Sequence, residues 1–287
     1  MSATEPIAAA THMGAVHLTV ADLERSLEYY RESIGLDVLK EGDGRATLGA
    51  GTTRLLELVE VPGAQPAPGR TGLFHFALLL PDRHSLASWV AHAVRTRLRL
   101  AGASDHFVSE AIYLSDPDRH GIEIYADRPR ELWDGQVAER MGTDPLDLDG
   151  LLEELGDPRT APFDGQPLGT TMGHVHLSVA EVPATVAFYC DALGFALMAA
   201  FGAQASFMSA GGYHHHLGAN TWESRGNRRP PPGHATLEQV TIVLPEAVDV
   251  ERLAHEAAAV GAEPERREDG VLVRDASGNP VLLTTRP

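Results

Sequence analysis

The sequence lacks the features that are typical of secreted and membrane proteins. It has one cysteine, Cys190, so an intramolecular disulfide is excluded and a reducing, cytoplasmic location is favoured. It has no apolar run near the ~18 residues that a membrane span needs. The first residues, with Glu5 and Pro6, lack the basic start of a secretory signal. Cys190 lies in an apolar stretch, where we expect a buried core thiol on a helix rather than a nucleophile.

Basic residues are also scarce. The chain has 23 Lys and Arg against 40 Asp and Glu, and its formal net charge is −17. Nucleic acids and anionic membranes are bound mainly by clusters of basic side chains. We therefore expect neither partner, and a small molecule or another protein remains. A homo-oligomer is the prior expectation for the assembly.

The chain repeats itself at an offset of 159 residues. Residues 13–21 read MGAVHLTVA, and residues 172–180 read MGHVHLSVA. The same offset connects single residues further along the two halves: Tyr30 and Tyr189, Gly35 and Gly194, Asp116 and Asp275. The sequence is therefore a tandem duplication.

Each half divides again, because a second strand and helix pattern starts at Leu73 and at Leu237. In module one, a β run precedes a helical stretch, Leu23–Ile34, which ends at Gly35. The modules, of the form β-α-β-β-β, span residues 13–62, 70–127, 169–228 and 234–287. The predicted domains are a first repeat (1–127), a connector (128–168) with an amphipathic helix near Leu146–Leu155, and a second repeat (169–287). The fold class is α+β.

Residues that do not repeat are candidates for chemistry, because a duplicated scaffold repeats its packing residues but needs reactive groups at one site. At three positions one half has a residue that commonly binds metal ions and the other half does not. These are His75 with its counterpart Gln239, Glu123 with Leu282, and His174 with Ala15. Each taken alone can be a hydrogen-bonded or half-exposed strand residue. Together, in apolar strands, they would be costly to bury unless a metal ion compensated them. Two histidines and one carboxylate form the facial set of non-haem Fe(II) oxygenases.

Other polar residues leave alternatives open. His176 has a copy in His17, which favours a structural role. The run His214–His216 is either a polar surface loop or the source of an imidazole that transfers a proton near neutral pH. Tyr113 precedes Glu123 by ten residues and is either a core residue or a second group facing the same cavity.

These motifs resemble the vicinal-oxygen-chelate superfamily, and within it the two-domain extradiol dioxygenases of the catechol 2,3-dioxygenase type. The resemblance covers residues 73–77, 104–106, 116–125, 172–177 and 213–216. It implies four β-α-β-β-β modules forming two barrels. It also implies Fe(II), with Mn(II) as an alternative, and the insertion of both atoms of O2 into a catechol-like diol to give a muconic-semialdehyde-type product in aromatic hydrocarbon catabolism.

The resemblance also assigns roles to residues. His75, Glu123 and His174 correspond to the metal ligands. His215 corresponds to the acid–base histidine and Tyr113 to a tyrosine that contacts the diol. Contacts with the substrate are implied for His106 and His214.

The chain departs from the best-known members, in which both ligand-bearing modules belong to the C-terminal half. Here the ligand positions of module four hold Gln239 and Leu282. We therefore predict that modules two and three share the active barrel, and that modules one and four form an inactive one. His174 must then lie within about 6 Å of His75, because metal–ligand bonds are only ~2 Å long.

Two rival functions stay open on this fold. A glyoxalase-type isomerase or thiol transferase uses a further carboxylate or glutamine from the partner module, and residues 214–222 offer none. A metal-free small-molecule-binding protein would have no reason to hold His75, Glu123 and His174 at non-repeating positions. Fold resemblance cannot separate these functions, so the site must decide.

Overall fold

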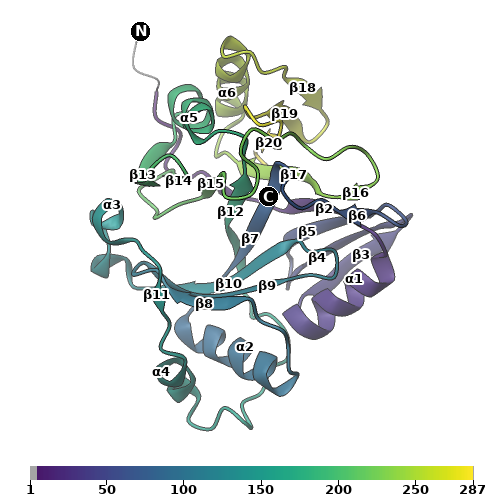
Figure 1. Ribbon diagram of the computed structural model, residues 1–287, viewed down its shortest axis with the longest axis vertical. Coiled ribbons are helices and arrows are strands. Elements are labelled where there is room, and N and C mark those ends of the chain that lie inside the picture. Colours follow the sequence, from purple (N-terminus) through teal and green to yellow (C-terminus); the bar gives the residue numbers. More distant parts are fainter. Residues whose placement is uncertain (1–4, 287) are drawn as a thin grey trace.

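The computed structural model describes residues 5–286, and two large curved sheets form its core (Figure 1). Each sheet has nine strands within those residues. The first runs β18 (Glu265–Arg267), β19 (Gly270–Arg274), β20 (Pro280–Thr284), β17 (Leu237–Val243), β2 (Val16–Val20), β5 (Thr53–Glu60), β4 (Arg45–Ala50) and β3 (Asp37–Gly42), with β1 (His12–Met13) paired to β17. The second runs β11 (Asp144–Pro145), β8 (Gly102–Asp105), β9 (Ser109–Ser115), β10 (Gly121–Asp127), β7 (Gly72–Leu80), β12 (Thr171–Ser178), β15 (Leu217–Asn220), β14 (Ala205–Ser209) and β13 (Ala196–Phe201). A separate pair joins β6 (Gln65–Pro66) to β16 (His234–Ala235).

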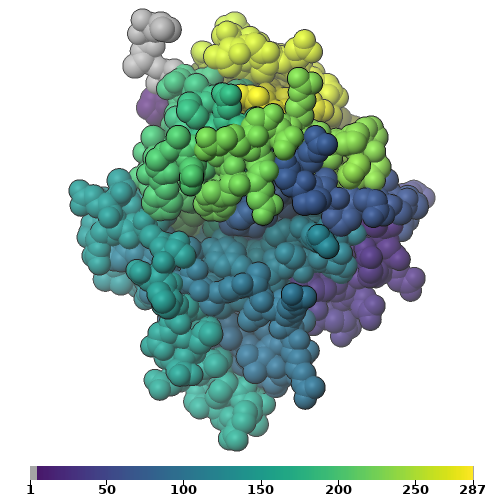
Figure 2. Space-filling model, in the orientation of Figure 1, coloured from purple at the N-terminus to yellow at the C-terminus, as the bar shows by residue number. Residues whose placement is uncertain are grey.

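Each sheet combines one module from each half of the chain. β7 of module two and β12 of module three are antiparallel neighbours, with His75 opposite His176. β2 of module one and β17 of module four pair in the same way, with His17 opposite Gln239. The predicted pairing of the modules is confirmed, and we call the two units the 2–3 barrel and the 1–4 barrel. Figure 2 shows blue residues of the first half set among green residues of the second.

Helices cover one face of each sheet. In module one, the Asp22 carboxylate caps α1 (Leu23–Tyr29) by accepting a backbone N–H of its first turn. The helix continues as a π turn (Tyr30–Ile34) and ends at Gly35, whose φ of +88° lies in the left-handed region. The predicted helix is therefore an α-helix with a π-helical last turn. The other covering helices are α2 (Arg83–Arg95), α5 (Val182–Val186) with its π turn (Ala187–Ala192), and α6 (Ala247–Ala259).

The alternation of side chains along a strand leaves the other face of each sheet for different residues. Phe76 and Leu78 of β7 are fully buried in the main apolar core. His75 and Ala77, which alternate with them in sequence, point to the opposite, inner face of the curved sheet. The inner face of the 2–3 barrel is therefore where its polar strand residues gather.

Repeated polar residues join the two barrels. The Tyr30 hydroxyl of one barrel donates to Asp116 Oδ2 of the other at 2.9 Å, and Tyr189 donates to Asp275 Oδ2 at 3.4 Å. Oδ1 of each aspartate accepts two backbone N–H groups of its own turn. These positions repeat along the chain because the same junction is built twice.

The connector closes one end of the 2–3 barrel. Its strand β11 pairs with β8 at the edge of the sheet, and Trp133 and Val137 pack in a small apolar cluster with Phe207. Its short helices are a 3-10 turn (Arg130–Leu132), α3 (Val137–Arg140) and α4 (Leu148–Leu152) with a 3-10 turn (Glu153–Leu155). The predicted helix near Leu146–Leu155 is thus present but shorter. The limits of the two repeats and of the connector stay predictions.

Two further expectations concern the membrane and the cysteine. Among the described residues, no helix has the length and apolarity that crossing a bilayer requires. Cys190 lies in the π turn of module three, half-buried rather than fully buried as expected, and packs against the main core. Burial raises the pKa of its thiol to about 11, so the thiol is protonated at neutral pH and is a poor nucleophile.

Candidate metal centre

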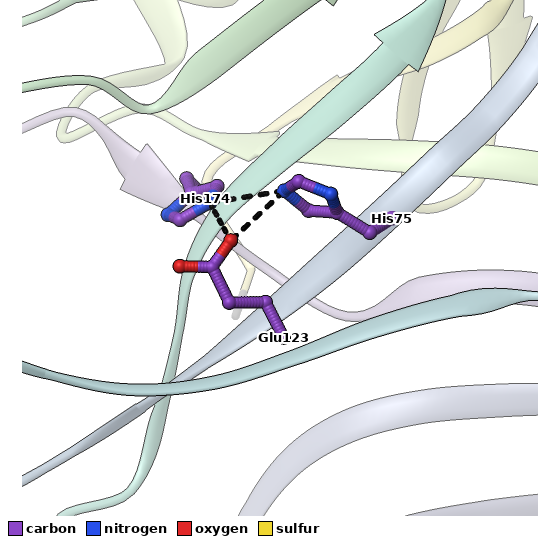
Figure 3. Close-up of side chains that lie close together, drawn as sticks. All are labelled: His75, Glu123 and His174. Atoms are coloured by element: carbon purple, nitrogen blue, oxygen red, sulfur yellow. Dashed lines mark hydrogen bonds and ion pairs between the residues drawn. The ribbon is translucent and has the colours of Figure 1, made fainter. Parts of the chain in front are cut away.

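Three strands of the 2–3 barrel bring His75, Glu123 and His174 together (Figure 3). Glu123 of β10 and His174 of β12 both lie opposite Ala77 of β7, one from each side. His75 precedes Ala77 by two residues, so the strand alternation places all three side chains on the same face. Ala77 is fully buried, and its single methyl group leaves room for the longer side chains around it.

The ligand atoms form a nearly equilateral triangle. Nε2 of His75 lies 3.3 Å from Nε2 of His174, and Oε2 of Glu123 lies 3.0 Å from the former and 3.1 Å from the latter. With bonds of about 2.1 Å, ligands at right angles are about 3.0 Å apart and tetrahedral ligands about 3.4 Å apart. The three edges lie between these two values, so the triangle fits three ligand positions around one ion. The predicted approach of His174 to His75 is confirmed.

Burying these three polar side chains together is unfavourable unless an ion compensates them. All three side chains are buried, and Nδ1 of His174 has no hydrogen-bond partner among the described residues. Burial alone would raise the pKa of Glu123, but the imidazoles of His174 and His75 outweigh it and hold that pKa well below its usual value. Burial lowers the pKa of His174, although Glu123 opposes the shift. An ionised carboxylate beside a neutral imidazole is the protonation state that a metal ion requires.

The triangle lines a cavity of about 720 Å³. Tyr113 stands opposite Glu123 on the neighbouring strand β9, as its spacing predicts, and also lines the cavity. Burial and the Glu123 carboxylate raise its pKa, so the hydroxyl stays protonated. That hydroxyl is 2.6 Å from Nε2 of His106, whose Nδ1 is 2.6 Å from the carbonyl of Gly142. The carbonyl fixes the proton of His106 on Nδ1, so Tyr113 donates to Nε2.

His215 lines the same cavity, with its ring centroid 4.0 Å from that of His174. Its Nδ1 is 2.8 Å from Nδ1 of His214, and Nε2 of His214 is 2.8 Å from the carboxylate of Asp127. The carboxylate accepts a hydrogen bond from the Nε2–H of His214. Nδ1 of His214 is then unprotonated and accepts a hydrogen bond from the Nδ1–H of His215. The chain of bonds leaves Nε2 of His215 as an unprotonated acceptor. Burial lowers the pKa of His215 well below its usual value, which keeps the ring neutral.

The histidine run is not a polar surface loop. His214, His215 and His216 are all buried. Nδ1 of His216 accepts from the hydroxyl of Ser209 and the backbone N–H of Ala210, so its role is structural. His214 is fully buried and both of its ring nitrogens have partners within the protein, and its predicted contact with a substrate stays a prediction.

Sequence reasoning missed residues that support the site. Asp127 is four residues after Glu123, and the strand period places both on the inner face, so the alternation could have identified it. His176, assigned to the scaffold because His17 repeats it, also lines the cavity, and its buried Nε2 has no partner among the described residues. The connector residue Met141, at the cavity wall, had no signal in the sequence.

The 1–4 barrel lacks this arrangement. Gln239 takes the place of His75 opposite His17, and its amide nitrogen lies 3.4 Å from Nε2 of His17 and donates to the Thr241 hydroxyl at 3.3 Å. Leu282 pairs with Thr241 as Glu123 pairs with Ala77. Among the residues that the structure describes, His75, Glu123 and His174 are the group of three arranged to hold a metal ion.

Comparison with known proteins agrees with this geometry. Residues 11–124 and 171–283 match the Glyoxalase/Bleomycin resistance protein/Dioxygenase superfamily. The chain belongs to this superfamily, and its fold is the α+β vicinal-oxygen-chelate fold.

Particular relatives narrow the class. A catechol-2,3-dioxygenase of Bacillus subtilis (strain 168) is 44% identical over 272 residues, which are 92% of this chain and 94% of the relative. The chain is thus a catechol 2,3-dioxygenase-like enzyme. Glyoxalase I from Zea mays shares the fold at a TM-score of 0.59 and 18% identity, covering 96% of this chain and 92% of its own. The cppA protein from Streptococcus pneumoniae TIGR4 shares it at a TM-score of 0.56 and 11% identity, covering 99% of both chains.

Proposed function

We propose that the protein is an extradiol ring-cleaving dioxygenase, which inserts both atoms of O2 into a catechol-like diol and forms a muconic-semialdehyde-type product. The observation that carries the proposal is the triangle of His75, Glu123 and His174, whose edges of 3.0–3.3 Å fit three ligand positions around one ion. The identity to a catechol-2,3-dioxygenase supports the reaction class.

His75, Glu123 and His174 would hold the ion, with Glu123 supplying one negative charge and the imidazoles staying neutral. When bound, Fe(II), or Mn(II) with the same ligands, orients the diol and O2 beside each other and tunes their electronics. Because the protein supplies three ligands, the ion would have positions left for a substrate that binds through two neighbouring oxygens.

The proton transfers are assigned to His215. Its neutral ring lines the cavity, and Asp127 and His214 fix its remaining lone pair on Nε2. It would accept a proton from a diol hydroxyl and later return it as the ring opens. Tyr113, kept protonated by burial and by Glu123, donates its hydroxyl proton to Nε2 of His106 and would accept a hydrogen bond from a diol hydroxyl. A substrate contact for His106 stays a prediction and would act through the bond to Tyr113.

A glyoxalase-type reaction is disfavoured by one position. Glu123 pairs with the residue two positions after His75, and Gly218 pairs with the residue two positions after His174. Gly218 therefore occupies the place in module three that Glu123 has in module two. A Cβ on Gly218 would lie 2.8 Å from the ring of His176, so that ring fills the space a fourth ligand would need.

The test is anaerobic reconstitution with Fe(II), followed by catechol and air. Absorbance follows the yellow ring-opened product, and an iron assay measures the bound metal. Colour with about one iron per chain is expected from a single three-ligand site. Bound iron without colour, across several substituted catechols, would overturn the proposal in favour of the isomerase. No bound iron would favour a metal-free binding protein.

The proposal extends to the setting of the reaction. The single cysteine favours a cytoplasmic location, and the reaction belongs to aromatic hydrocarbon catabolism. A homo-oligomer, whose size gel filtration with light scattering would measure, stays the expectation for the assembly.

A further inference from the structure

The cavity beside the candidate metal centre is several times larger than a single diol ring. Its volume is about 720 Å³. Catechol displaces roughly the volume of four water molecules, on the order of 120 Å³. Cavities of about 300–1,000 Å³ typically enclose ligands of drug-like size. Most of the space is therefore available to a substituent on the ring.

One wall of this space is a continuous set of aromatic rings that starts at the metal ligands. The His176 ring lies 5.0 Å from that of His75, and the Trp222 ring lies 5.7 Å further on. Phe74 packs edge-on against both His176 and Trp222, at 5.2 and 5.1 Å. Phe207 contacts His176 at 5.5 Å and His215 at 5.1 Å. This aromatic wall consists of Phe74, His176, Phe207 and Trp222.

At the outer part of the wall, large aromatic side chains are exposed to solvent, which is unfavourable when no ligand covers them. Trp222 is 51% exposed although it lines the cavity. Phe201, packed edge-on against Phe207 at 5.3 Å, also lines the cavity and is 43% exposed. Large exposed apolar surfaces beside a cavity indicate a site that an apolar group covers. Aromatic rings gain most when another ring packs at their edge or face.

We propose that the preferred substrate is a catechol with a bulky aromatic substituent, which packs against the aromatic wall while the diol faces His75, Glu123 and His174. This inference rests on the proposed ring cleavage and adds the class of substrate. A phenyl ring on the carbon beside one hydroxyl is the simplest such group. The wall begins at a metal ligand and ends at Trp222, so it has room for a second ring but gives catechol itself little to contact.

A substituent with a carboxylate is the rival. Arg70 and Arg119 also line the cavity, each two residues before the start of β7 or β10. Both are exposed and lie toward the strand ends, whereas the aromatic wall adjoins the ligands. An aromatic substituent is therefore favoured, and a carboxylate-bearing diol is included in the test as the competing substrate.

The experiment compares kcat/KM for catechol, 3-phenylcatechol and 3-(2-carboxyethyl)catechol in the iron-loaded enzyme and in two variants. In the wild type, 3-phenylcatechol is expected to be the best of the three. Trp222→Ala is expected to lower kcat/KM for 3-phenylcatechol about tenfold and to change that for catechol little, since it removes one aromatic contact. Trp222→Phe, which keeps a ring at the position, is expected to restore most of the loss.

A binding measurement separates this inference from the proposed function. Trp89 and Trp133 are buried, so Trp222 is the tryptophan that a ligand in the cavity can reach. Titration of 3-phenylcatechol without O2 is expected to quench wild-type fluorescence and to leave Trp222→Phe nearly unquenched. Cleavage of catechol with equal or better kcat/KM than 3-phenylcatechol, or a preference for the carboxylate, would overturn the inference and leave the proposed function intact. Quenching without cleavage of any diol would overturn the proposed function, and with it the assignment of the substrate.

Discussion

The two barrels share one plan and differ at the residues on their inner faces. At the centre of the 2–3 barrel, His75 and His174 face each other across paired strands, with Glu123 beside them. At the same place in the 1–4 barrel, the Gln239 amide donates to Thr241, lies beside His17 and accepts from Arg267, and Leu282 offers no ligand atom. The amide is satisfied by the protein alone, whereas the two imidazoles and the carboxylate are best satisfied by an ion.

The comparison teaches which repeated residues belong to the fold. Tyr30 and Asp116 recur as Tyr189 and Asp275, and both pairs join one barrel to the other. The residues that differ between the halves gather in one place. In a duplicated chain, a position that repeats therefore usually indicates packing, and a change from an ionisable to a non-ionisable residue indicates the candidate site.

The largest effect, on iron binding, is expected when Glu123 of the 2–3 barrel is replaced by the residue found at the equivalent position of the 1–4 barrel. Glu123→Leu installs the side chain of position 282, and bound iron should fall from about one ion per chain to near none, since two imidazoles remain from a three-ligand face. Without metal the variant should be as stable as the wild type or more so, by about 1–4 kcal/mol, because a buried carboxylate is removed. Iron analysis after anaerobic reconstitution, together with urea unfolding, measures both.

The matched control for that change lies in the other barrel. Leu282→Ala removes a buried side chain and should cost about 2–5 kcal/mol of unfolding free energy while leaving the iron content unchanged. Loss of iron in Leu282→Ala would show that the metal site reports general stability, and the distinction between the barrels would fail.

The next effect separates proton transfer from metal binding within the 2–3 barrel. His215→Ala should keep its iron and lose about 10²–10⁴-fold in turnover, the usual contribution of a positioned acid–base group. His216→Asn, at the neighbouring imidazole bonded to Ser209 and Ala210, should lose stability but keep turnover per folded molecule. Equal iron loss in His215→Ala and Glu123→Leu would make His215 a ligand or a fold residue.

The junctions should respond alike on the two sides. Asp116→Ala and Asp275→Ala each leave two backbone N–H groups and a tyrosine hydroxyl without an acceptor, which should cost about 3 kcal/mol of unfolding free energy in either variant. Asp275→Ala also removes the acceptor of the Asn279 side-chain amide, so its cost should be the larger of the two. Chemical denaturation gives the cost, and iron analysis should show no change. A loss of iron in Asp116→Ala alone would mean that this junction also positions the site.

The smallest effect concerns a histidine of the 1–4 barrel. Burial lowers the pKa of His17 to about 4, from an ordinary value of 6.5. Between these pH values His17 is protonated in the unfolded chain and neutral in the folded chain. His17 therefore lowers the free energy of unfolding as the pH falls. Between pH 7 and pH 5 this contribution is about 2 kcal/mol. In His17→Asn, the drop in unfolding free energy over that interval should be smaller by this amount, and identical drops in urea titrations would contradict the assignment.

The sequence was sufficient for the fold, the pairing of the modules and the meeting of the three candidate ligands. The duplication exposed His75, Glu123 and His174 as unmatched positions, and the need to bring them together dictated which modules pair. The family resemblance placed His215 and Tyr113, and both line the cavity.

Other parts of the site depend on packing that no periodicity encodes. The three histidines of residues 214–216 are polar residues, but they are buried, because the nearby Ser209 and Ala210 satisfy a nitrogen of His216 and the distant Asp127 satisfies one of His214. The return of the connector to cover the barrel, with Trp133 against Phe207, is a tertiary contact between segments far apart in sequence. His176 showed that a repeated residue can also serve a site when its surroundings differ.

The most direct test of the account is the location of the metal in crystals grown anaerobically with Fe(II), by anomalous diffraction at the iron edge. We expect one peak per chain in the 2–3 barrel, about 2 Å from His75, Glu123 and His174, and none in the 1–4 barrel beside His17 and Gln239. A peak in both barrels, or a peak bound by other residues, would contradict the claim that the unmatched residues of the duplication form the site.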